Sequence, residues 1–185
     1  PPPAPFMALE EELRGGFDVE SIDLGSVQSI PDTVDVLLVM EPRTLSDGAL
    51  YAIDQYVMRG GPTIICADRN DFPMPRNLSD FNATNIETGM EGLLNAWGVT
   101  FTEEVVFDDV SGEFFFQAGP QGGGLGGRGA GRVVDVDWPG APLVGRDEEG
   151  ANRECSALAG FEEARFWLPS AIEVSDIEDI ASTEL

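Results

Sequence analysis

The stretch that most restricts the fold of this chain is a block of two apolar runs separated by one amphipathic segment. The runs "VDVLLVM" at 34–40 and "PTIICA" at 62–67 are rich in β-branched residues, which is typical of buried parallel strands. Between them, apolar residues recur at helical spacing over 46–59, and Gly60 and Gly61 follow where helices commonly end. We expect a right-handed crossover here. The block predicts an α/β fold with an open, mainly parallel sheet and helices on both faces.

The rest of the chain carries shorter patterns of the same two kinds. We expect helices at 6–16 and 90–98, strands at 17–24, 132–138 and 161–174, and a strand or a strand pair at 99–109. Residues 119–131 include eight glycines and predict a flexible loop. No apolar run is long enough to span a bilayer, so we do not expect this chain itself to cross a membrane. These elements predict a single α/β domain over 1–175, followed by an acidic tail or linker at 176–185.

The net charge of the chain excludes polyanionic partners. The chain has 34 acidic and 10 basic residues and a net charge of −24, so a nucleic-acid backbone or an anionic lipid surface would be repelled. Two explanations of this acidity remain open. Hydrated carboxylates are an adaptation to high salt, in which their repulsion is screened. Alternatively, the acidic surface matches a cationic partner.

The absence of two residue types excludes the common mechanisms of nucleophilic and general-base catalysis. The chain has no histidine, and all 10 basic residues are arginine, so there is no imidazole base and no catalytic lysine. Cys66 lies near the end of the second apolar run and is expected to be a buried, inert core residue, while Cys155 lies in a polar stretch. We therefore expect no enzyme activity, no catalytic residues, no metal site and no cofactor.

Polar residues follow both apolar runs of the central block. Glu41 and Arg43 come after the first run, and Asp68, Arg69 and Asn70 come after the second. Ligands of open α/β sheets gather outside the carboxyl ends of the strands, which makes these five residues the candidate ligand-binding set. A purely structural role in turns is the alternative for all five.

The order of these segments resembles a known family. "MALEEELRGGFDVESIDL", "IPDTVDVLLVMEPRTLSDGALYAIDQYVMRGGPTIICAD", "MEGLLNAWGVTFTEEVVFDD" and "NRECSALAGFEEARFWLPSAIEV" together resemble the extracytoplasmic domain of auxiliary components of ABC-type transport systems associated with gliding motility. The resemblance covers about residues 6 to 174. It implies a flavodoxin-like fold similar to the class I glutamine amidotransferases, in a protein anchored by transmembrane helices outside this chain.

The resemblance also implies a function. We expect a non-enzymatic, extracytoplasmic interaction or substrate-handling domain, whose partners are a membrane permease or other subunits of an ABC transporter. The alternative is an amidotransferase-like domain that binds a small ligand, or an enzyme, that uses the carboxyl ends of the strands. No catalytic motif is carried over with the resemblance.

Overall fold

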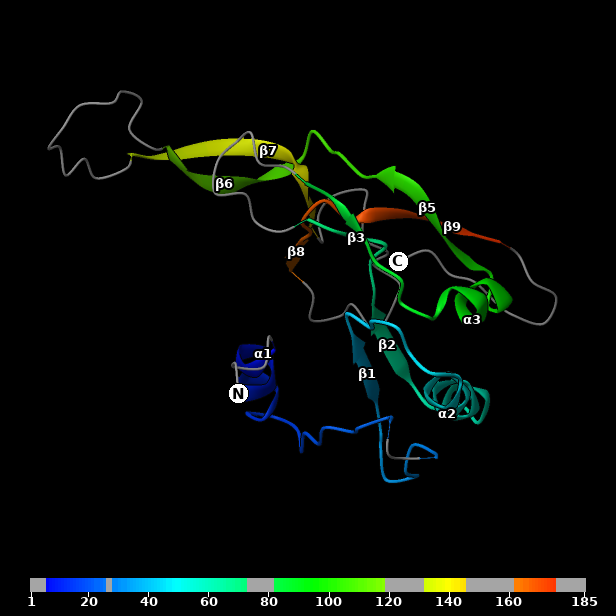
Figure 1. Cartoon of the computed structure of the whole chain (residues 1–185). Helices are drawn as coiled ribbons and strands as arrows, with labels where there is room; N and C mark the ends of the chain where they lie inside the picture. The colour runs from blue at the N-terminus through cyan, green and yellow to red at the C-terminus, as the bar shows by residue number, and fades with distance from the viewer. Residues whose placement is uncertain (1–5, 26–27, 73–81, 119–131, 146–161, 176–185) are drawn as a thin grey trace, which may run out of the picture. The chain divides into compact units, whose positions relative to one another are not determined.

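The computed structural model describes residues 6–25, 28–72, 82–118, 132–145 and 162–175 (Figure 1). The chain divides into two compact units, Pro1–Leu37 with Ser46–Ile64 and Leu38–Leu45 with Ile65–Leu185. The single domain over 1–175 stays a prediction. The predicted glycine-rich loop at 119–131, the tail at 176–185 and Cys155 lie outside the described residues.

The central block forms the predicted strand, helix and strand. They are β1 (Leu37–Met40), α2 (Asp47–Met58) and β2 (Thr63–Cys66), and β1 and β2 are neighbours in one sheet. Leu37 N–H donates to the Pro62 carbonyl (2.9 Å), and Glu41 N–H donates to the Cys66 carbonyl (2.7 Å). Both strands advance by the same amount between these two bonds, so they run parallel. The prediction of two adjacent parallel strands joined by a helix is confirmed.

The first unit has its core beneath α2. Ser46 caps the helix by accepting a hydrogen bond from Ala49 N–H (3.3 Å), and Gly60 closes it with a φ of 86°. The apolar stripe of the helix is buried together with residues before and within β1: Ile30, Leu37, Ala49, Ala52, Ile53 and Tyr56. The same unit contains α1 (Met7–Leu13), which has no buried residue. Helical periodicity thus located this helix.

The second unit consists of small antiparallel sheets and one short helix. β3 (Asn70–Asp71) pairs with β4 (Thr84–Asn85), and β5 (Val99–Val105) pairs with β9 (Ser170–Val174). β7 (Arg132–Gly145) lies between β6 (Ser111–Ala118) and β8 (Glu163–Arg165). The helix α3 (Glu91–Ala96) precedes β5 and contacts it. Buried residues of this unit include Val39, Met90, Leu94, Ala141 and Leu168.

The expected open, mainly parallel sheet with helices on both faces is wrong, and the flavodoxin-like or amidotransferase-like architecture goes with it. Among the described strands only β1 and β2 run parallel, and the other pairings are antiparallel. Each parallel neighbour needs a long crossover, usually a helix, and α2 is the described helix that provides one. The expected burial of β1 on both faces is also wrong, because Leu37 and Val39 are buried whereas Leu38 is exposed.

Two further expectations, each about a single strand, are wrong. Residues 17–24 form no strand in the described structure, because alternation alone does not make a strand without a partner to accept its hydrogen bonds. The final strand expected at 161–174 is instead the two strands β8 and β9. The break falls at Leu168, whose φ of 43° is incompatible with an extended strand.

Candidate functional site

The segment that follows β1 has an unusual backbone conformation. Glu41 and Thr44 have φ angles of 40° and 52°, a region that residues other than glycine rarely enter. Backbone bonds hold this segment at both ends. Glu41 N–H donates to the carbonyl of Cys66 (2.7 Å), and Thr44 N–H donates to the carbonyl of Glu87 (2.8 Å). Arg43 is therefore presented by a loop that is hydrogen-bonded on either side of it.

The segment that follows β2 is organised around the carboxylate of Asp68. Its Oδ1 accepts a hydrogen bond from Asn70 N–H (3.1 Å) and another from the hydroxyl of Ser170. The side-chain amide of Asn70 donates to Ser170 Oγ (3.1 Å), so both side chains are tied to the start of β9. Ile86 N–H donates to the Arg69 carbonyl (2.7 Å), which extends the β3–β4 pairing by one bond.

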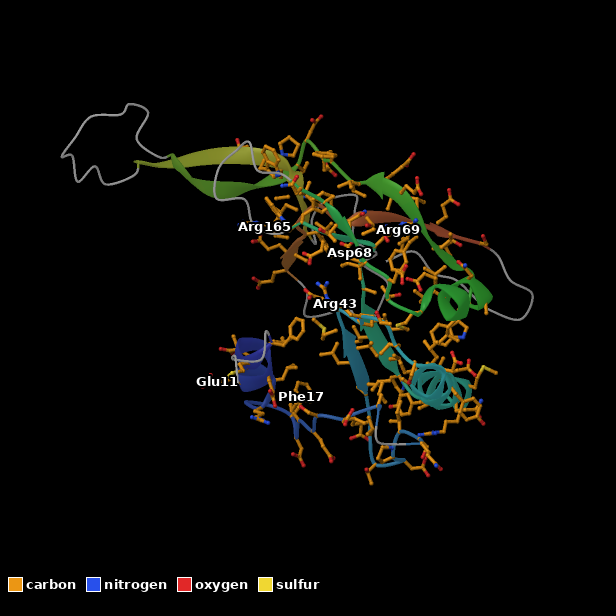
Figure 2. The ribbon with its side chains drawn as sticks, in the orientation of Figure 1. Glu11, Phe17, Arg43, Asp68, Arg69 and Arg165 are labelled. Carbon is orange, nitrogen blue, oxygen red and sulfur yellow. The ribbon has the colours of Figure 1, made fainter. Side chains whose placement is uncertain are left out.

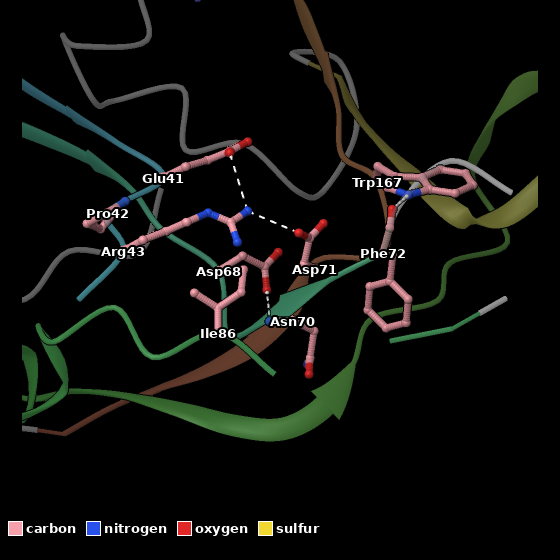
Figure 3. Close-up of a pocket in the computed structure, with 9 residues that line it drawn as sticks. All are labelled: Glu41, Pro42, Arg43, Asp68, Asn70, Asp71, Phe72, Ile86 and Trp167. Carbon is pink, nitrogen blue, oxygen red and sulfur yellow. Dashed lines mark hydrogen bonds and ion pairs between the residues drawn. The ribbon is translucent and has the colours of Figure 1, made fainter. Parts of the chain in front are cut away.

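These segments border a pocket of about 250 Å³ within the second unit (Figure 3). That volume is just below the range of roughly 300–1,000 Å³ common for small-molecule sites, so the pocket fits a small group. Figure 2 marks Arg43 and Asp68 among the side chains of this unit. The lining residues are Glu41, Pro42, Arg43, Asp68, Asn70, Asp71, Phe72, Ile86 and Trp167.

Arg43 forms the ion pairs of the pocket. One of its terminal nitrogens lies 3.1 Å from Asp71 Oδ2 and 3.9 Å from Glu41 Oε2 (Figure 3). The side chains of Arg43 and Asp71 are 53% and 43% exposed, so water screens the pair. Exposed pairs of this kind contribute about 0–1 kcal/mol. The arrangement therefore orients the guanidinium without locking it in place.

An aromatic wall faces these charges. The Trp167 indole N–H donates to the carbonyl of Phe72 (3.0 Å), and both residues line the pocket. Leu168, the next residue, has a φ of 43°. Each of the three non-glycine residues with positive φ in the described structure, Glu41, Thr44 and Leu168, either lines the pocket or adjoins a lining residue. Such strain is concentrated at functional sites, which makes this pocket the candidate site.

Four of the five predicted residues line this pocket, and Arg69 does not. Glu41, Arg43, Asp68 and Asn70 come together as expected from the ends of β1 and β2. Arg69 points elsewhere: it lies 3.4 Å from Glu103 on β5 and borders a second pocket of about 90 Å³. Whether any of the five binds a ligand stays a prediction.

Glu91 lines the second pocket and caps the segment before α3. Thr88 donates to Glu91 Oε1 from its backbone N–H (2.9 Å) and from its hydroxyl (2.8 Å). Burial acts to raise the pKa of Glu91, but hydrogen bonds from its own N–H, from Thr88 and from Gly89 outweigh it, and the pKa is lowered. The pattern "TGME" at 88–91 is a capping-box signature that a reading of the sequence can recognise.

The expectation that Cys66 is buried is wrong, whereas its inertness stays a prediction. Its side chain is exposed and free, because the residue falls on the uncovered face of β2. Asp68, the nearest acidic residue in the sequence, accepts hydrogen bonds from Asn70 and Ser170 through its carboxylate. In the part of the chain that the structure describes, no group of three or more histidine, cysteine or acidic side chains is placed to hold a metal ion.

Reasoning from the sequence missed the far wall of the pocket. Asp71 and Phe72 directly follow the predicted set, but Ile86 and Trp167 are distant in the chain and reach the pocket through the β3–β4 pairing and the turn before β9. Only the fold brings these segments together. The signal that was available is "DRNDF" at 68–72, in which a polar turn ends on an aromatic residue.

Comparison with known proteins identifies a family. A family model described as ABC-type uncharacterized transport system, for auxiliary components, matches residues 1–185. No curated protein and no solved structure matches the chain. Among the described residues, none of the helices has the length and apolar character needed to cross a membrane.

Proposed function

Because the chain belongs to the ABC-type uncharacterized transport system family of auxiliary components, we propose that it is a non-enzymatic interaction and substrate-handling domain of such a subunit. In this proposal the domain lies outside the cytoplasm and works with the membrane permease or another subunit of the transporter. Its contact with the transported material or the partner is made at the pocket lined by Arg43, Asp71 and Trp167.

The observation that carries this proposal is the pocket itself. It combines charged side chains with an aromatic wall, which is the mixture that binding sites use to orient a ligand. Hydrogen bonds and ion pairs within the site orient its charged groups. The sequence has no histidine, so the usual general base of acyl transfer is missing. These features support recognition rather than catalysis.

Co-purification tests the interaction role. The full-length protein that carries this chain is tagged in its own cells and isolated from solubilised membranes. We expect the permease or ATPase of its transport system to co-purify at a constant ratio. Replacing both Arg43 and Asp71 by alanine should lower that ratio. Arg14→Ala is the matched control, because it removes an exposed arginine that pairs with Glu10 outside the pocket.

Two results would contradict different parts of the proposal. If no transporter subunit accompanies the wild-type protein, the interaction role is wrong. If the pocket variant and Arg14→Ala behave alike, the partner contact lies elsewhere.

A second candidate is binding of a small transported solute at the same pocket, without a protein partner there. The cavity of about 250 Å³ favours it, because protein contact surfaces are generally flatter. In that case the pocket variant should lose transport but keep the transporter subunits bound.

A further inference from the structure

We infer that the pocket between Arg43 and Trp167 recognises a positively charged group on an apolar stem, an alkylammonium or alkylguanidinium. The inference deepens the proposed function and rests on it for its biological role. The binding itself can be measured on the isolated chain, so the two can fail separately.

The charges that line the pocket favour a positively charged ligand. The lining contains three carboxylates, Glu41, Asp68 and Asp71, against the single guanidinium of Arg43. Arg43 already lies 3.1 Å from Asp71 and 3.9 Å from Glu41, so its charge is compensated within the pocket. An entering anion would have to displace these carboxylates in a chain whose net charge is −24. A cation meets an excess of negative charge, and it competes only with the half-exposed guanidinium of Arg43.

Two carboxylates can contact the ligand. Both hydrogen bonds that described residues make to Asp68 fall on Oδ1, so Oδ2 can accept one from a ligand. Asp71 pairs with Arg43 where both side chains remain partly exposed. A ligand cation can therefore take the place of Arg43 beside Asp71 while the released guanidinium turns to water. Because the exchange replaces one ion pair by another, it leaves no buried charge without a partner.

The remaining wall suits the uncharged part of such a ligand. Trp167 and Phe72 provide aromatic surface, and the bond from the Trp167 indole to the Phe72 carbonyl (3.0 Å) fixes the indole. Aromatic rings attract cations and pack against aliphatic carbon. Pro42 and Ile86 complete the apolar lining. Figure 3 shows the charged groups on one side of the pocket and the two aromatic residues on the other.

Binding is tested by titrating the complete 185-residue chain with n-butylguanidinium at constant ionic strength. Butyrate is the anionic probe of similar stem, and butyramide is the neutral one. Nuclear magnetic resonance follows the indole N–H signals of the three tryptophans, assigned by single Trp→Phe variants. We expect saturable binding of n-butylguanidinium that shifts the signal of Trp167 but not that of Trp97, and neither effect with the other two probes.

Variants distinguish recognition from folding. Asp68→Asn and Asp71→Asn should each weaken binding by roughly fivefold, about the largest effect usual for an exposed ion pair. Arg43→Gln should strengthen binding, because it removes the competing cation. Glu104→Gln changes an exposed carboxylate on β5 outside the pocket and should have no effect. Loss of structure cannot imitate this pattern, since one pocket variant gains affinity.

Three outcomes overturn the inference: no saturable binding of n-butylguanidinium, preferred binding of butyrate, or weaker binding in Arg43→Gln. The source of the cation is settled by repeating the titration with a Gly-Arg-Gly peptide with blocked ends. Tighter binding of the peptide supports a partner's arginine, and tighter binding of n-butylguanidinium supports a free solute. Cation binding without any co-purifying transporter subunit would support the site while contradicting the interaction role.

Discussion

The hydroxyl of Tyr56, on the last turn of α2, donates a 2.9 Å hydrogen bond to the backbone carbonyl of Val34, which precedes β1. The Tyr56 side chain is 2% exposed. Arg59, one turn later, lies with its guanidinium 5.0 Å from the Tyr56 ring centre and donates to the carbonyl of Ile30. The end of the helix thus holds the segment that leads into the first strand, and residues 30 to 34 have contacts despite forming no regular element.

Replacing Tyr56 by phenylalanine should destabilise the protein by about 1–2 kcal/mol, because the Val34 carbonyl loses its donor while the ring stays packed. Urea unfolding followed by circular dichroism measures the free energy. Tyr51→Phe is the matched control on the same helix, since Tyr51 is 62% exposed, and it should change stability by less than about 0.5 kcal/mol. Equal effects of the two substitutions would show that the Val34 bond contributes nothing.

The central block was predictable because local signals agreed there. Helical periodicity and the closing glycines both place α2, and the apolar runs on either side pair across this single helix. The ends of β1 and β2 then carry Arg43 and Asp68 to one pocket, as the neighbouring parallel strands require.

The second half was not predictable, because its pairings depend on residues far apart in the chain. Val99 lies opposite Val174 in β5 and β9, and no local pattern distinguishes that pairing from a parallel one. Trp167 reaches the pocket only through this arrangement. The apolar content of β1 also left its burial undetermined, since Leu38 is as apolar as Leu37 and yet is exposed.

Replacing Gly89 by alanine should destabilise the protein by about 2 kcal/mol or more. Gly89 has a φ of 77°, and a Cβ atom there would lie 2.8 Å from the backbone nitrogen of Leu45. Both the backbone conformation and the contact oppose a side chain, and the neighbour is backbone that cannot rotate away. Thermal and urea unfolding measure the change.

Gly92→Ala is the control for that substitution. Gly92 lies in α3, and a Cβ atom there meets nothing within 4 Å. Alanine should stabilise this helix by about 0.5–1 kcal/mol. The two glycine-to-alanine changes should therefore have opposite signs, and destabilisation by both would mean that the geometry around Gly89 is not the cause.

Lowering the pH should remove the contribution of Glu91 to the stability of the folded chain. Its pKa is lowered in the folded chain, so the charged form is favoured by folding. The resulting stability is fully present above the ordinary pKa of glutamate and is lost as the pH falls through the lower folded value. The difference in free energy of unfolding between wild type and Glu91→Gln should be about 1 kcal/mol at neutral pH and should shrink as the pH falls.

Glu104→Gln provides the comparison for that titration, since Glu104 is an exposed residue of β5. Its free-energy difference from wild type should stay small across the same pH range. A difference for Glu91→Gln that does not depend on pH would indicate that the substitution acts through packing rather than through the charge of the carboxylate.

Salt should stabilise the protein. A net charge of −24 on 185 residues makes the folded chain repel itself, and raising sodium chloride from about 0.1 M to 1 M shortens the screening length from roughly 10 Å to 3 Å. The melting temperature should rise over this range. The double variant Glu11→Gln with Glu173→Gln removes one exposed carboxylate from each unit, and it should melt higher than wild type at low salt and gain less from added salt. A melting temperature that does not respond to sodium chloride would remove the adaptation to high salt as the cause of the acidity. The cationic partner would then be the better explanation, in agreement with a pocket that favours positive charge.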